Sequence, residues 1–123
     1  MQNETLLESN FSQALKEFAE SNAIDSAARM KLFKAYAHLI DSLSSDDWQT
    51  REHKLLFLFS SFMEQLDLAS QGESARVLYL YTFREFLDTY AAEPIIQTAI
   101  QQAIDNPLLN LSIRTVLALE YRT

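Results

Sequence analysis

Apolar residues recur every three or four positions along most of the chain. The first stripe holds Leu7, Phe11, Leu15 and Phe18, and the second holds Met30, Phe33, Ala37, Ile40 and Leu43. A spacing of three or four residues places side chains on one face of an α-helix, whereas a strand alternates every second residue. The pattern therefore predicts two amphipathic helices between residues 7 and 43.

Two later segments, about 46–70 and 73–90, are apolar over a wider arc. The stripe of the first is formed by Trp48, Leu55, Phe59, Phe62 and Leu66, and is widened by Leu56, Leu58 and Met63. The second segment is almost wholly apolar over residues 77–81 and amphipathic after that. Because a helix with a wide apolar arc is covered on more than one side, we expect these two helices in the middle of the fold.

Residues that start or stop helices separate these segments. Ser44 and Asp47 resemble a capping box with Asp in place of Glu. Gly72 follows the third segment, where a residue with free access to left-handed φ would end the helix. Pro94 and Pro107 stand where a fifth and a sixth helix would start, because Pro at the first helical position loses no hydrogen bond.

These elements predict an all-α fold, a compact single-domain bundle of about six helices that spans residues 1–123. A chain of 123 residues can bury enough surface for one core, and it contains no linker that would separate a second domain.

A weak internal repeat accompanies this pattern. An offset of 47 aligns residues 28–29 with 75–76 and Asp41 with Asp88. Paired helices at such a period would indicate a duplicated helical hairpin, although stacked arrays usually need three or more units. The duplication is therefore a hypothesis at this point.

Composition excludes several classes of function. The chain has one Gly and no Cys, so Gly-rich phosphate loops, thiolate metal sites and disulfide frameworks are excluded. A net charge of −7 opposes binding to nucleic acid or to anionic lipid. The longest strongly apolar run, residues 55–59, is too short to cross a membrane, and the N-terminus lacks the features of a secretory signal. We expect a cytoplasmic protein that binds neither nucleic acid nor membrane.

Positive charge is concentrated in one stretch. Residues 26–54 hold five bases and four acids, whereas both flanking stretches are acidic. These cations could form a basic patch, but we favour the interpretation that they neutralise the acidic first helix and the region of Asp46 and Asp47.

No catalytic or metal-binding constellation is apparent. Di-iron helical bundles carry a Glu three residues before each ligating His, but the residues at that distance from His38 and His53 are Ala35 and Thr50. No Ser stands in the Gly-rich turn typical of a nucleophile. Carboxylates three residues apart on polar faces are typical of solvated helices. We therefore expect a protein that is not an enzyme and that holds no cofactor or metal.

An aromatic stripe is the most distinctive feature of the fourth helix. Tyr79, Phe83, Phe86 and Tyr90 share one face, and a second stripe contains Leu80, Leu87 and Ala91 with Arg84. Such stripes usually belong to a core, yet aromatic residues beside an Arg also form the energetic centres of protein interfaces. The candidate partner-binding residues are therefore Tyr79, Phe83, Arg84, Phe86 and Tyr90.

Excess apolar helical surface without catalytic groups favours a protein-protein interaction module, a small regulatory or adaptor protein that binds another protein through an apolar helix face. Homodimerisation would be a simple way to cover such a face.

Two alternatives remain open. The first is an acidic inhibitor, of the immunity or nucleic-acid-mimic type, that blocks a basic partner surface; it requires clustering of Glu64, Asp67, Glu73, Glu85, Asp88 and Glu93. The second is a small-molecule sensor with an aromatic pocket between helices; its lining would come from Tyr36, Trp48, Tyr79, Tyr81 and Phe83, with His38 or Arg84 as the polar anchor.

Overall fold

The computed structural model describes residues 2–20, 26–67 and 73–121, and it describes the side chains of these residues except 2–5, 67 and 73–76. The described residues form α1 (Gln2–Glu20), α2 (Ser26–Ser42), the short 3₁₀-helix η1 (Leu43–Ser45), α3 (Trp48–Asp67), α4 (Glu73–Tyr90), α5 (Pro94–Ile104) and α6 (Leu111–Glu120). No strand occurs in this part of the chain, so the predicted all-α fold of about six helices is confirmed.

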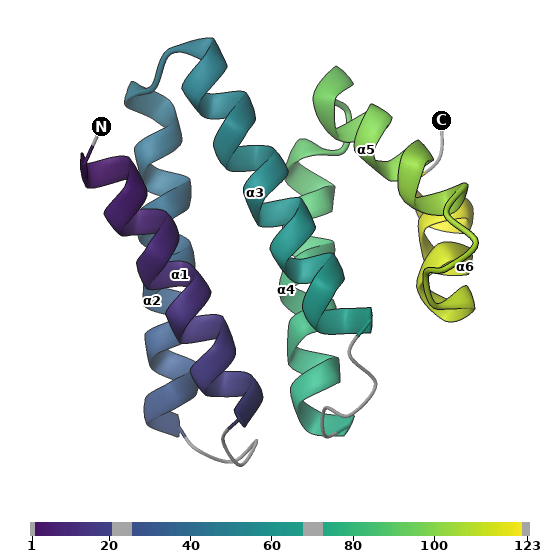
Figure 1. The fold of residues 1–123 in the computed structure, drawn as a ribbon, viewed down its shortest axis with the longest axis horizontal. Helices are drawn as coiled ribbons and strands as arrows, with labels where there is room; N and C mark the ends of the chain where they lie inside the picture. Colours follow the sequence, from purple (N-terminus) through teal and green to yellow (C-terminus); the bar gives the residue numbers. More distant parts are fainter. Residues whose placement is uncertain (1, 21–25, 68–72, 122–123) are drawn as a thin grey trace.

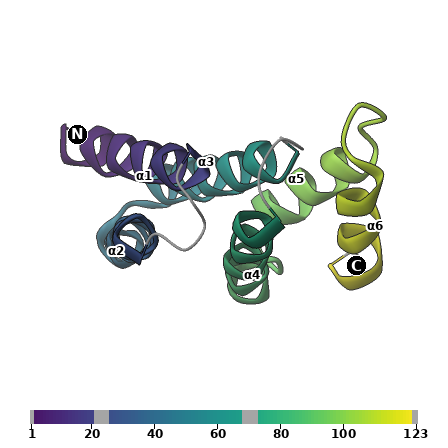
Figure 2. The same cartoon turned by 90° about the horizontal axis from the view of Figure 1, so that it is seen from below.

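Consecutive helices pack in pairs, α1 with α2, α3 with α4, and α5 with α6 (Figure 1). Seen from below (Figure 2), α1, α3 and α5 follow one another in one layer, while α2 and α4 lie beneath them and α6 closes the end. Helix α3 contacts α1, α4 and α5, as expected for a helix with a wide apolar arc. Helix α4 packs on α3 and lies in the second layer between α2 and α6.

Phe62 of α3 joins the first two helical pairs in the core. Its ring is fully buried. The ring centroid lies 5.5 Å from that of Phe11 on α1 and 5.9 Å from that of Tyr36 on α2, and both pairs meet edge to face. On the other side its ring centroid is 5.8 Å from that of Phe83 on α4. Because such aromatic pairs add to the stabilisation from burial alone, one side chain couples four helices.

The offset of 47 in the sequence also relates the helices. Helix α1 ends at Glu20 and α3 at Asp67, while α2 begins at Ser26 and α4 at Glu73. Core positions correspond across the same offset, each of them buried: Phe11 with Leu58, Leu15 with Phe62, Leu32 with Tyr79, Ala35 with Thr82, and Leu39 with Phe86. The first two helical hairpins therefore have similar bounds and share five buried positions, although α3 also buries Phe59 and Met63, whose counterparts in α1 are exposed.

The two prolines behave differently. Pro94 is the first residue of α5, as predicted. The prediction for Pro107 is wrong, because α6 begins only at Leu111. The side chain of Asn110 accepts hydrogen bonds from two backbone N–H groups of the first turn, at 2.8 and 3.4 Å. These two N–H groups have no acceptor within the helix, so the cap by Asn110 sets the start of α6 after the turn that contains Pro107.

The start of α3 also differs in detail from the expected capping box. Oδ1 of Asp47 accepts the backbone N–H of Thr50 at 2.8 Å, and this bond lowers the pKa of Asp47. The hydroxyl of Ser44, in η1, instead donates to the carbonyl of Asp41 in the last turn of α2. Asp47 alone caps the helix, because Ser44 is drawn into the preceding turn. Gly72, the predicted terminator of α3, lies outside the described residues.

A buried ion pair holds the corner between α2 and α3. The Nζ atom of Lys54 lies 2.7 Å from Oδ2 of Asp46 and donates to the hydroxyl of Ser42 at 2.8 Å. Lys31 pairs with an acid of the first helix, as predicted: its Nζ atom lies 2.7 Å from Oε2 of Glu17. The cations of residues 26–54 thus neutralise the acids that we expected them to meet, at least at these two positions.

Candidate functional site

The aromatic stripe of α4 lies in the core. Tyr79 and Phe86 are fully buried and Phe83 is 2% exposed. The hydroxyl of Tyr79 donates to the carbonyl of Leu15 at 2.9 Å, which satisfies its polar tip. These three side chains have no surface to offer a partner.

The remaining two candidates lie at the edge and on the surface. Tyr90 is half-buried, with the guanidinium of Arg51 5.8 Å from its ring centroid. Arg51 in turn makes a two-pronged ion pair with Glu93, which raises the pKa of Arg51 and ties α3 to the start of α5. Arg84 is exposed on the other side of α4. An interface on α4 therefore has to be sought around Arg84.

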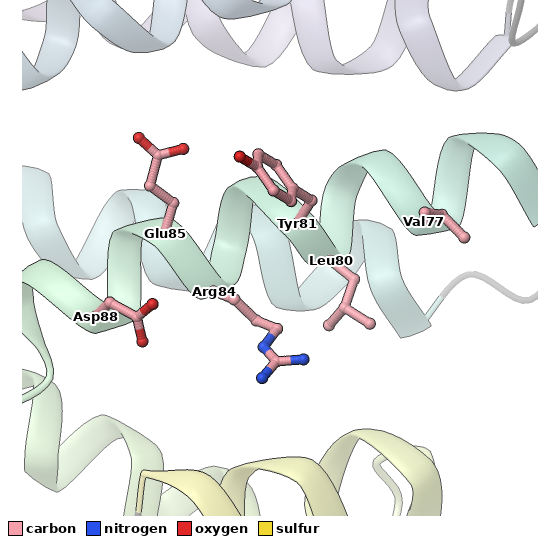
Figure 3. Close-up of a pocket in the computed structure, with 6 residues that line it drawn as sticks. All are labelled: Val77, Leu80, Tyr81, Arg84, Glu85 and Asp88. Atoms are coloured by element: carbon pink, nitrogen blue, oxygen red, sulfur yellow. The ribbon is translucent and has the colours of Figure 1, made fainter.

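An open hollow of about 550 Å³ lies along that side of the helix. Its lining, here called the α4 face, comprises Val77, Leu80, Tyr81, Arg84, Glu85 and Asp88 (Figure 3). These residues recur at helical spacing, so a single element fixes their positions. Val77 is 62% exposed and Tyr81 is 66% exposed, which is high for large apolar side chains on a well-packed helix.

The α4 face changes character along its length. Val77, Leu80 and Tyr81 form an apolar half, and Glu85 and Asp88 follow in the next turns. Figure 3 shows Tyr81 and Glu85 on one side of the helix and Leu80 and Arg84 on the side toward α6. The hollow is therefore apolar at one end and acidic at the other.

Two contacts from the end of α6 set the electrostatics of the α4 face. Nη2 of Arg84 lies 2.7 Å from Oε2 of Glu120, and the hydroxyl of Tyr121 donates to Oδ1 of Asp88 at 3.0 Å. Tyr121 and Glu120 together raise the pKa of Arg84. Since Glu120 already neutralises Arg84, the carboxylates of Glu85 and Asp88 leave this surface with an excess of two negative charges.

The contact between α4 and α6 is filled by side chains. The space between Leu80, Leu87, Ile113, Val116 and their neighbours amounts to about 10 Å³. A volume of that size is close to the smallest that admits a single water molecule, so this interface is packing and not a ligand site.

A second hollow, of about 400 Å³, lies between α1 and α3. Its lining is mostly polar and carries both signs of charge: Ser12, Leu15, Lys16, Ala19, Glu20, Ser61, Glu64 and Gln65. It offers no exposed large apolar side chain, and therefore lacks the anchor that protein recognition favours.

The residues proposed for an aromatic pocket do not share a cavity. Trp48 is 68% exposed at the start of α3, and Tyr81 is exposed on α4. Tyr79 and Phe83 are buried in the core. Tyr36 packs against Phe11 and Phe62, so the five side chains lie in three different surroundings.

The acidic residues proposed for an inhibitor surface are divided among several places. Glu64 lines the hollow between α1 and α3, Glu85 and Asp88 belong to the α4 face, and Glu93 is paired with Arg51. The side chains of Asp67 and Glu73 are outside the described set. The described carboxylates therefore do not form the single acidic face that this alternative requires.

Both His side chains lie at the surface. His38 is exposed on α2, and Nε2 of the exposed His53 lies 3.4 Å from Oε2 of Glu8. Among the described residues, no three His, Asp or Glu side chains are grouped so as to hold a metal ion. Within the same residues, no helix is both long and apolar enough to span a bilayer.

The sequence does not single out Val77, because residues 77–81 form one apolar run. It assigns Tyr81 to an aromatic pocket and Glu85 and Asp88 to an acidic face, and it does not group these three residues with Val77. The available signal was their spacing: Val77, Tyr81, Glu85 and Asp88 recur every three or four residues, on a face other than that of Tyr79 and Phe83.

Comparison of the chain with protein-family models, with curated proteins and with solved structures finds no match. The function has to be argued from the geometry of the α4 face.

Proposed function

We propose that this protein is a protein-protein interaction module that binds its partner through the α4 face. The observation that carries the proposal is the exposure of Val77 and Tyr81, one turn apart, beside an open hollow. Large apolar side chains grouped on the surface are typical of interaction sites. Tyr and Arg, both present here, are enriched among the residues that dominate binding energy.

The rest of α4 prepares this surface for binding. The buried side of the helix is fixed by Tyr79, Phe83 and Phe86, so the exposed side is presented without a change in backbone conformation. A preformed face avoids part of the entropic cost of ordering an interface. This rigidity supports a binding role in a regulatory or adaptor protein. A chain without Cys also fits the reducing cytoplasm, where we place it.

Site-specific photo-crosslinking in the native host tests the proposal. A benzophenone side chain at position 81 should crosslink to a defined partner, whereas the same group at the exposed position 34 on α2 should not. Absence of a crosslink at position 81, or equal yields at both positions, would contradict the proposal.

The crosslinked partner, once purified, allows a quantitative test. Val77→Asp should weaken its binding about thirtyfold, because a charge replaces an apolar anchor worth about 2 kcal/mol. Met30→Asp is the matched control, since Met30 is an exposed apolar residue of α2 with 68% exposure. Equal effects of the two variants would count against a site on α4.

A further inference from the structure

We infer that the partner of the α4 face is a basic amphipathic helix, with apolar side chains against Val77, Leu80 and Tyr81 and with Lys or Arg toward Glu85 and Asp88. The inference rests on the proposed function and adds the chemistry of the partner. It follows from the order of the lining residues, apolar first and acidic one turn later.

Charge complementarity determines the sign of the charge that the partner carries. Arg84 is paired with Glu120 at 2.7 Å, so its charge is largely cancelled before any partner arrives. Asp88 accepts one hydrogen bond from Tyr121, and a carboxylate can accept several more. Glu85 and Asp88 can therefore both receive cations, and a partner with acidic residues there would meet repulsion.

The length and backbone of the site favour a helical partner. The lining extends from Val77 to Asp88, which is about 17 Å or three turns at about 1.5 Å per residue. Backbone groups within α4 are bonded along the helix, so recognition has to use side chains and not strand addition. An amphipathic helix places anchors at three- and four-residue spacing over the same length.

A second copy of the chain fits the site less well than a basic helix. In a symmetric dimer each α4 face would meet an identical face with the same excess of negative charge, and each copy carries a net charge of −7. Anionic membranes are disfavoured by the same repulsion.

A displayed library provides the probe. The library holds helices about 16 residues long, enough to cover the three turns of the lining, with Leu fixed at positions spaced by three and four residues and with all polar positions free. Peptides that bind the native protein are isolated from this library. Their affinity is then measured for the native protein, for Val77→Asp, and for a double variant, Glu85→Lys with Asp88→Asn. The amide oxygen introduced at position 88 can still accept the Tyr121 hydroxyl. A second double variant, Glu20→Lys with Glu64→Gln, makes the same charge change in the hollow between α1 and α3.

Binders of the native protein should be enriched in Lys and Arg over Asp and Glu. Their affinity should fall about tenfold for the variant at positions 85 and 88, which removes two surface ion pairs. It should be retained by the variant at positions 20 and 64.

Other outcomes separate the inference from the proposed function. Binders that need Val77 but show no preference for basic residues would overturn the inference and leave the proposed function standing. Binders indifferent to Val77→Asp would overturn both. A dimer in light scattering that Val77→Asp dissociates would show that a second copy, and not a basic helix, occupies the site.

Discussion

The ammonium group of Lys54 lies 2.7 Å from Oδ2 of Asp46, and both side chains are withdrawn from water, with exposures of 1% and 10%. A buried charge is tolerated only when it is paired and hydrogen-bonded. Lys54 meets this condition through Asp46 and through the hydroxyl of Ser42, which itself donates to the carbonyl of Leu39. Through Ser42 and Asp46, Lys54 therefore joins the end of α2 and the connection after η1 to the second turn of α3.

Lys54→Met should lower the free energy of unfolding by about 3 kcal/mol or more, because it leaves the carboxylate of Asp46 buried without its cation. Lys31→Met is the control, since the pair of Lys31 and Glu17 is exposed and its loss should cost at most about 1 kcal/mol. Urea unfolding of both variants measures the difference. Similar losses would show that the pair at the corner is not shielded from solvent.

Truncation of two tyrosines that lie two positions apart on α4 should have very different effects on stability. Tyr79→Ala removes a fully buried ring and its bond to Leu15, and should cost about 3 to 5 kcal/mol. Tyr81→Ala removes an exposed ring and should change stability by no more than about 0.5 kcal/mol. Thermal or urea unfolding checks both. A large loss for Tyr81→Ala would place that residue in the core and remove the anchor of the α4 face.

Stability should decline at alkaline pH through the phenols of the buried Tyr79 and the partly buried Tyr36. Burial raises the pKa of Tyr36 and of Tyr79 above the usual value of 10, and the charge of Glu85 adds to the rise at Tyr36. Both phenols thus stay protonated in the folded chain at a pH where the unfolded chain loses these protons. Their contribution is complete below about pH 10 and is lost as the pH rises above it.

The measurement for this pH dependence is the free energy of unfolding on either side of about pH 10, in the native protein and in Tyr79→Phe. The variant lacks one of the two phenols, so its stability should fall less steeply. An identical slope in both proteins would mean that Tyr79 ionises as readily when folded as when unfolded.

Asn110→Ala should destabilise the protein by about 1 kcal/mol and should loosen α6 in particular, because two N–H groups of its first turn lose their acceptor. Amide exchange over residues 111–120 reports this loosening directly. Asn106→Ala is the control: Asn106 accepts the N–H of Leu108 at 3.0 Å, but in the turn before the helix. Unchanged exchange in Asn110→Ala would show that Asn110 does not hold the start of α6.

The helices could be predicted from the sequence because their period depends only on local spacing. The stripe from Leu7 to Phe18 and the Pro at position 94 are enough to place α1 and the start of α5. The start of α6 was not predictable from Pro107, because Asn110 competes as a cap and the stronger side-chain cap decides the boundary.

The site was only partly predictable, for a different reason. Helix α4 carries apolar residues on several faces, and the spacing does not reveal which face the neighbouring helices cover. Tyr79 contacts Phe18 and Leu15 of α1. Phe83 contacts Phe59 and Phe62 of α3. These long-range contacts determine that Val77 and Tyr81 lie on the surface. No local sequence pattern shows such contacts.

Asp88 takes part in two relationships at once, since it lines the hollow and also accepts the hydroxyl of Tyr121. Because a carboxylate accepts several hydrogen bonds, a cation can bind Asp88 without displacing the hydroxyl of Tyr121. The end of the C-terminal helix and the α4 face therefore share one side chain, so a substitution of Asp88 alters both.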